Sequence, residues 1–77
     1  MENIKVAIIG LGYVGLPLAH LFATRYPVVG FDIKQDRVEA LKKGQDITME
    51  VSDGKLKSVL LSHLPEFDET GLYFTSA

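Results

Sequence analysis

Three glycines early in the chain have a spacing that could serve chemistry. Gly10, Gly12 and Gly15 form the pattern G-x-G-x-x-G within the apolar stretch IIGLGYVGLPLAHLF, residues 8–22. In this pattern the first glycine allows a tight turn, the second lets a phosphate approach the backbone, and the third lets a helix pack closely on a sheet. Free N–H groups at the start of that helix would face the phosphates. The spacing therefore predicts a loop that binds the pyrophosphate of a dinucleotide.

A carboxylate follows at the distance that such a loop requires. Asp32 lies 22 residues after Gly10, at the end of the short apolar run VVGFD. A carboxylate there can accept both hydroxyls of an adenosine ribose and would repel the 2′-phosphate of NADP. Glycines also cluster in ordinary strand-to-helix turns, and the acid could be a solvated loop residue or a helix cap. The combination of strand, glycine turn, helix and terminal acid favours NAD as the ligand.

Three other side chains belong to types that could do chemistry. Arg37 could lie beside the adenosine ribose or balance the charge of Asp32, and its plain alternative is a solvated helix cation. His20 and His63 each stand alone in an expected helix, without a partner acid or metal-ligand spacing, so we expect surface or packing roles. The sequence has no cysteine, which leaves no thiolate metal site, disulfide or cysteine nucleophile within these residues.

The glycine turn needs a strand before it and a helix after it. Residues 4–9, IKVAII, are apolar and β-branched, which is typical of a strand covered on both faces in a parallel sheet. A helix is expected from Tyr13 to about Arg25, with Pro17 near its start, where proline is tolerated. Four apolar side chains at helical spacing share one face of this helix: Val14, Leu18, Leu21 and Phe22.

The remaining elements repeat this alternation. Residues 28–32 predict a second strand, and residues 36–43 predict a short helix. Ser52 is a candidate N-cap for a further helix that Pro65 ends. The apolar stripe of that helix would consist of Leu56, Val59, Leu60 and Leu64. Residues 72–75, LYFT, are aromatic and β-prone and predict a third strand.

The order of elements predicts the fold class. Strand, helix, strand, helix, helix, strand calls for an α/β fold: a Rossmann-like parallel sheet with right-handed crossovers and the strand order 3-2-1. This corresponds to the first half of a doubly wound sheet. We therefore expect residues 1–77 to be the N-terminal part of an NAD-binding Rossmann domain, with the remaining domains absent from this chain.

Composition narrows the possible partners. The chain has 8 Lys and Arg residues against 10 Asp and Glu, and its basic residues are scattered, so no patch predicts binding to nucleic acid. Residues 6–22 are apolar enough to imitate a signal peptide or a membrane span. Three glycines, Pro17 and His20 interrupt this run, and it is shorter than the ~20 apolar residues of a spanning helix. We expect no membrane association and a cytoplasmic location.

Two stretches together resemble a known family. IKVAIIGLGYVGLPLA, followed by VVGFDIKQDRVEALKKG, is similar to the start of the UDP-glucose/GDP-mannose dehydrogenases. The specific parts are the G-x-G-Y-V-G-L form of the glycine pattern and the G-F-D-I end of the second strand. The GLGYVGLPLA version most resembles the bacterial branch that acts on UDP-N-acetylhexosamines in capsule and O-antigen synthesis. The resemblance covers essentially all 77 residues.

The resemblance implies an NAD-dependent enzyme that oxidises C6 of a nucleotide sugar from alcohol to carboxylate. Two hydride transfers would proceed through a covalent thiohemiacetal on a cysteine. The family pattern places Tyr13 and Val14 on the pyrophosphate side, Asp32 at the adenosine ribose and Arg37 beside it. The expected cofactor-binding set is therefore Gly10, Leu11, Gly12, Tyr13, Val14, Gly15, Asp32 and Arg37. The resemblance carries no catalytic residue, because the family's cysteine, lysine and substrate-binding groups lie beyond residue 77.

Two alternatives stay open at the level of sequence. A β-hydroxyacid dehydrogenase of the 6-phosphogluconate type also opens with a strand and G-L-G, although it would usually favour methionine at Val14. A non-catalytic α/β module that binds or interacts without chemistry would show the same elements. For the parent dehydrogenase we expect a homo-oligomer with a nucleotide-sugar substrate.

Overall fold

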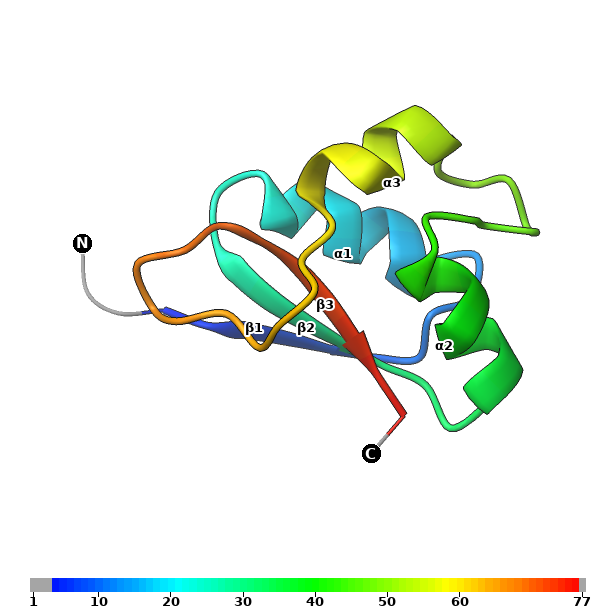
Figure 1. Ribbon diagram of the computed structural model, residues 1–77, viewed down its shortest axis with the longest axis horizontal. Helices are drawn as coiled ribbons and strands as arrows, with labels where there is room; N and C mark the ends of the chain where they lie inside the picture. Colours follow the sequence, from blue (N-terminus) through cyan, green and yellow to red (C-terminus); the bar gives the residue numbers. More distant parts are fainter. Residues whose placement is uncertain (1–3, 77) are drawn as a thin grey trace.

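A three-stranded parallel sheet carries the glycine turn in the computed structural model, which describes residues 4–76 (Figure 1). The strands are β1 (Val6–Ile9), β2 (Pro27–Phe31) and β3 (Gly71–Thr75). They lie in the order β1-β2-β3, and each is parallel to the next. Ile9 pairs with Phe31 and Phe31 with Thr75, so the three strands end at the same edge. The predicted α/β fold and the strand order 3-2-1 are confirmed.

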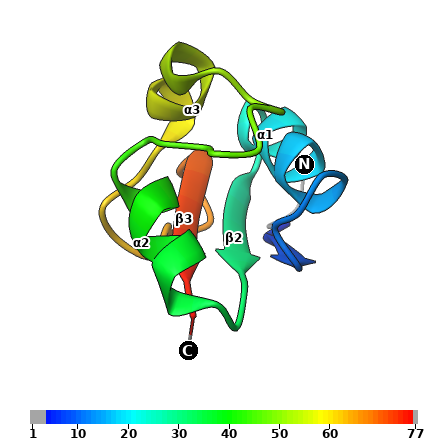
Figure 2. The same cartoon turned by 90° about the vertical axis from the view of Figure 1, so that its right-hand side faces the viewer.

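Three helices lie on one side of this sheet (Figure 1). They are α1 (Gly15–Ala23), α2 (Gln35–Lys42) and α3 (Asp53–Val59). Helix α1 lies over β1 and β2, α2 lies against β3, and α3 packs against α1 (Figure 2). Each crossover leads from one strand to the next parallel strand in the same direction across the sheet, so the helices gather on one face.

The core lies between the helices and the covered face of the sheet. Val28, Leu72 and Phe74 point into it from β2 and β3 and are fully buried. Val29 of β2 and Tyr73 of β3 alternate with these residues, so they point to the opposite face, where they are only half-buried. The expectation that the first strand is covered on both faces is wrong: β1 is an edge strand of the described sheet, and its residues alternate between half-buried and exposed. Helix α1 covers one face of β1, and no helix of residues 4–76 covers the other, so only one set of its side chains is half-buried.

Helix α1 buries a different face from the one that its leucines suggest. Its buried residues are Leu16, Ala19 and Ala23, whereas Leu18 and Leu21 are 40% and 64% exposed. The helix starts at Gly15, against the backbone of β1, and small side chains permit that close approach. The apolar periodicity was therefore an unreliable guide here, because both faces of the helix are apolar and size decides which one packs.

The segment after α2 also departs from the sequence expectation. Ser52 caps α3 as predicted, since its side chain accepts a hydrogen bond from the backbone N–H of Lys55 at 3.3 Å. The helix ends at Val59, however, before the predicted stop at Pro65. Leu60 is extended and forms an isolated parallel bridge with Leu72 of β3. Hydrogen bonding to β3 therefore outcompetes the last turn of the expected helix.

Candidate functional site

The glycine turn follows directly from the sheet. The N–H of Gly10 donates to the carbonyl oxygen of Phe31 at 2.8 Å, so the hydrogen-bond ladder between β1 and β2 extends into the turn. Gly10 has a φ of 94°, a conformation that L side chains rarely adopt. A Cβ at Gly15 would overlap the carbonyl oxygen of Gly10. The first and third glycines are thus required by the fold itself.

Gly12 differs from both of these glycines. An added Cβ there would meet nothing within 4 Å, and its φ lies outside the left-handed region. Nothing in the described residues requires a glycine at this position, so the space beside it is available to a ligand. Among residues 4–76, no acceptor is hydrogen-bonded to the backbone N–H groups of Gly12, Tyr13 or Val14. These open donors at the start of α1 fit a phosphate group.

Leu11 anchors the turn from three directions. Its side chain is fully buried in the core. Its N–H donates to Oδ2 of Asp32 at 3.0 Å, and its carbonyl oxygen accepts hydrogen bonds from Nε and Nη2 of Arg37 at 3.0 and 2.6 Å. Leu11 therefore positions the turn, and its contact with the cofactor stays a prediction.

Asp32 lies at the end of β2 with both carboxylate oxygens directed by backbone groups. Oδ2 accepts from Leu11, and Oδ1 accepts from the N–H of Lys34 at 3.0 Å. These two hydrogen bonds lower the pKa of Asp32, with further help from the charges of Lys34 and Arg37 and against a smaller effect of burial. A carboxylate has about four lone-pair sites, so each oxygen can still accept a hydroxyl. The group is ionised and suited to the ribose of a nucleoside.

Arg37 connects the turn to the segment after α2. The side chain of Arg37 is only 10% exposed, and its Nη1 pairs with Oδ1 of Asp46 at 2.8 Å. Arg37 lines the same cavity as Asp32, but its hydrogen bonds are with the carbonyl oxygen of Leu11 and with Asp46. Its place beside the adenosine ribose stays a prediction. The alternative of a solvated helix cation is excluded by this burial.

Asp46 is the site residue that sequence reasoning missed. Its side chain is completely buried and accepts hydrogen bonds from Arg37, from the N–H and Oγ1 of Thr48, and from the N–H groups of Glu50 and Val51. Burial raises the pKa of Asp46, but the hydrogen bonds from the Thr48 side chain, Arg37 and the backbone outweigh it and lower the pKa from 3.8 to about 2. The available signal was an acid two residues before a threonine, a pattern that favours local side-chain capping of a turn.

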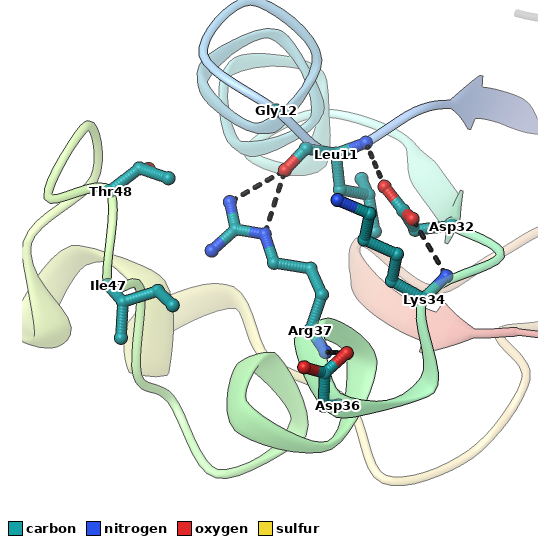
Figure 3. Close-up of a pocket in the computed structure, with 8 residues that line it drawn as sticks. All are labelled: Leu11, Gly12, Asp32, Lys34, Asp36, Arg37, Ile47 and Thr48. Atoms are coloured by element: carbon teal, nitrogen blue, oxygen red, sulfur yellow. Dashed lines mark hydrogen bonds between the residues drawn. The ribbon is translucent and has the colours of Figure 1, made fainter.

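A cavity of about 350 Å³ opens at the carboxyl ends of β1 and β2 (Figure 3). Its volume lies at the lower end of the range for ligand pockets, roughly 300–1,000 Å³. In Figure 3, Asp32 and Arg37 both approach Leu11, and Ile47 and Thr48 face them from the segment after α2. Eight residues line the cavity: Leu11, Gly12, Asp32, Lys34, Asp36, Arg37, Ile47 and Thr48. The predicted turn, acid and arginine therefore meet at one place.

The other candidates lie outside this cavity. Tyr13 and Val14 are 69% and 79% exposed at the start of α1, and Val14 is the N-cap, so the helix begins two residues later than expected. His63 follows α3 instead of lying within a helix, and its Nε2 pairs with Glu69 at 2.9 Å, so the expectation that it has no acidic partner is wrong. Neither His63 nor His20 lines the cavity.

Comparison with known proteins identifies the family of the chain. Residues 4–71 match the model of the UDP-glucose/GDP-mannose dehydrogenase family, NAD binding domain. The chain belongs to this family. The family membership decides against the β-hydroxyacid dehydrogenase alternative, and the cofactor of this family's domain is NAD, as the position of Asp32 predicted.

Relatives within the UDP-glucose/GDP-mannose dehydrogenase family are much longer than this chain. UDP-N-acetyl-D-glucosamine 6-dehydrogenase of Pseudomonas aeruginosa is 54% identical over 57 residues, which cover 74% of this chain and 14% of that protein. Protein CapL of Staphylococcus aureus is 44% identical over 61 residues, covering 79% of this chain and 14% of that protein. A solved UDP-D-ManNAc dehydrogenase from Pyrococcus horikoshii superposes with a TM-score of 0.74 at 35% identity, over 96% of this chain and 16% of that one.

Proposed function

We propose that the glycine turn and Asp32 bind the adenosine diphosphate half of NAD. The observation that carries this proposal is the open face of the turn: Gly12 borders free space, and the N–H groups of Gly12, Tyr13 and Val14 have no partner within residues 4–76. These donors would bind the pyrophosphate, and Asp32 would accept the ribose hydroxyls in the adjoining cavity. Gly10, Leu11, Gly15 and Arg37 would hold this arrangement in place.

We further propose that residues 1–77 are the N-terminal part of the NAD-binding domain of a nucleotide-sugar 6-dehydrogenase. The proposal is supported by the match to the family's NAD-binding domain and by relatives of which the chain covers only 14%. The reaction converts the C6 primary alcohol to a carboxylate, which consumes one water and reduces two NAD⁺ to two NADH with release of three protons. NAD supplies the hydride acceptor in both steps. The catalytic groups would come from the parent protein outside this segment.

A UDP-N-acetylhexosamine is the substrate class that we propose for the parent enzyme. Two relatives named for such substrates support it: the Pseudomonas aeruginosa enzyme at 54% identity and a UDP-N-acetyl-D-mannosamine dehydrogenase of Campylobacter jejuni at 46%. UDP-glucose is the second candidate, because the family description includes it. Similarity to CapL supports a role in the synthesis of capsular polysaccharide.

The test is an assay of the full-length dehydrogenase that carries this segment. The purified enzyme is incubated with NAD and, in turn, with UDP-N-acetylglucosamine, UDP-N-acetylmannosamine and UDP-glucose, and NADH absorbance and the acid product are measured. We expect two NADH per sugar oxidised and the highest kcat/KM with an N-acetylhexosamine. Binding of NAD without oxidation of any nucleotide sugar would refute the proposed activity while leaving the cofactor site intact.

Two further proposals concern the location and the oligomeric state of the full-length enzyme. Within residues 4–76, no helix combines the length and apolar character needed to cross a membrane. We propose a cytoplasmic enzyme, where NAD and nucleotide sugars are both present. We also propose a homo-oligomer, which light scattering of the full-length enzyme would test. A monomeric full-length enzyme at micromolar concentration would contradict that proposal.

A further inference from the structure

Asp46 is a buried carboxylate that does not line the cavity but is bonded to a residue that does. Its side chain is fully buried, and it accepts five hydrogen bonds, from Arg37, Thr48, Glu50 and Val51. Burial of an ion is costly unless it is paired and hydrogen-bonded. Four of these bonds come from the local segment, and capping that segment would not by itself require a charge. The fifth bond comes from the Arg37 guanidinium, and it is the one that an ionised carboxylate strengthens most, because both partners are charged.

The guanidinium of Arg37 lies between two acceptors. Nη1 contacts Asp46 at 2.8 Å, while Nε and Nη2 both reach the carbonyl oxygen of Leu11. Asp32 lines the same cavity, yet the described residues show no ion pair between Asp32 and Arg37. Since a free arginine in this cavity would be attracted to Asp32, the contact with Asp46 directs Arg37 away from the carboxylate that the ribose needs.

The carbonyl that Arg37 holds determines the direction of a phosphate-facing N–H group. The carbonyl of Leu11 and the N–H of Gly12 belong to one planar trans peptide, so they point in opposite directions. With the carbonyl fixed toward Arg37, the N–H of Gly12 is fixed on the side away from Arg37. Its neighbour, the Leu11 N–H, is fixed separately by Asp32.

We propose that Asp46 is a positioning residue for NAD binding. It holds Arg37 on the Leu11 carbonyl, which orients the N–H of Gly12 for the pyrophosphate and keeps Asp32 available to the ribose. Asp46 touches no part of the ligand itself, because its side chain is completely buried. This inference rests on the proposed binding of NAD at the glycine turn.

Asp46→Asn in the full-length dehydrogenase is the first variant that tests it. The amide has the same shape, but its NH2 group would face N–H donors in either orientation, on Arg37 and Thr48 or on Glu50 and Val51. We expect the Kd for NAD, measured by calorimetry, to rise about tenfold, and kcat at saturating NAD to change less than about twofold. Ser52→Ala is the matched control, since it removes the cap of α3 without touching Arg37. The control should lower Tm and leave the NAD affinity unchanged.

A double variant shows whether Asp46 acts through Arg37. In an Arg37→Met background, Asp46→Asn should raise the Kd for NAD no further than about twofold, because the side chain that it positions is gone. If Asp46→Asn fails to fold, Arg37→Lys replaces it: a single ammonium nitrogen keeps a charge beside Asp46 but cannot maintain the fork on the Leu11 carbonyl. We expect about a tenfold weaker Kd for that variant as well.

Three results would overturn the inference. They are an unchanged Kd for Asp46→Asn, an equal rise in Kd for Ser52→Ala, and a full tenfold effect of Asp46→Asn in the Arg37→Met background. Failure of the unmutated enzyme to bind NAD would instead refute the proposed site itself. The two failures are therefore distinguishable in one set of titrations.

Discussion

The glycine turn has two sides with opposite properties. The inner side, Gly10, Leu11 and Gly15, is closed by β1, β2 and α2: a Cβ at Gly15 would overlap backbone, and both polar groups of Leu11 are hydrogen-bonded. The outer side, Gly12, Tyr13 and Val14, borders open space and presents N–H groups without partners in the described residues. One short motif thus contains two glycines needed for folding and a third, Gly12, that we propose leaves room for a ligand.

Gly15→Ala tests the inner side and should have the largest effect. The new Cβ would overlap the carbonyl group of Gly10, which is backbone and cannot move aside as a flexible side chain could. We expect a loss of at least about 3 kcal/mol of unfolding free energy, which denaturant titration of the full-length enzyme would measure. A stably folded variant with unchanged Tm would show that α1 does not approach β1 as described.

Gly12→Val tests the outer side with a bulkier side chain. Its Cβ meets nothing within 4 Å, so we expect the fold and Tm to be kept. The added methyl groups would occupy the space that the pyrophosphate needs, and the Kd for NAD should rise on the order of 100-fold, or ~3 kcal/mol. Calorimetric titration with NAD checks this, and unchanged affinity in the folded variant would refute the phosphate-binding role of the turn.

Asp32→Ser tests the residue that contacts the inner side of the turn and, in the proposed site, also the ligand. Asp32 accepts a hydrogen bond from the N–H of Leu11, and in the proposed site its remaining lone pairs would accept the ribose hydroxyls. The unmutated enzyme should prefer NAD to NADP, and the variant should narrow that preference by about tenfold or more, because the charge that repels a 2′-phosphate is removed. Steady-state kinetics with both cofactors measures the ratio. Equal turnover of NAD and NADP by the unmutated enzyme would contradict this role of Asp32.

Protonation of Asp46 at acid pH should lower the free energy of unfolding. The pKa of Asp46 is about 2 in the folded protein and 3.8 in the unfolded reference, so its carboxylate stabilises the fold above pH 3.8 and loses this contribution as the pH falls toward 2. The expected loss is about 2 kcal/mol of unfolding free energy. Denaturant titrations at several pH values between about 4 and 2 should show a steeper decline for the unmutated enzyme than for Asp46→Asn. Parallel declines would show that Asp46 is not responsible.

The sequence predicted the parts of this fold that depend on local pattern and spacing. The glycine spacing and the terminal position of Asp32 located the cavity, and the alternation of elements predicted the strand order. The buried face of α1 was missed because apolar periodicity does not show whether Ala19 or Leu18 packs against the sheet. The close approach of the helix at Gly15 favours the smaller side chain, and the sequence pattern did not reveal that approach. These errors concern which apolar groups are covered and leave the site unchanged.

The hydrogen-bond network of Asp46, on which its proposed role rests, could not be predicted from the same patterns. Its cap over the backbone of Glu50 and Val51 is local, but its link to the glycine turn passes through Arg37 on another element to Leu11, 26 residues before Arg37 in the chain. An acid in a short connector is usually solvated, so composition gave no reason to single it out. Only the folded chain joins Asp46, Arg37 and Leu11 in one hydrogen-bond network.

Residue-resolved hydrogen exchange on the full-length enzyme, with and without NAD, tests the two-sided turn most directly. The amide of Leu11, bonded to Asp32, should be protected before NAD is added, whereas the amides of Gly12, Tyr13 and Val14 should exchange rapidly and become protected only with saturating NAD. Rapid exchange at Leu11 without NAD, or no change at Gly12 to Val14 when NAD is bound, would contradict the account.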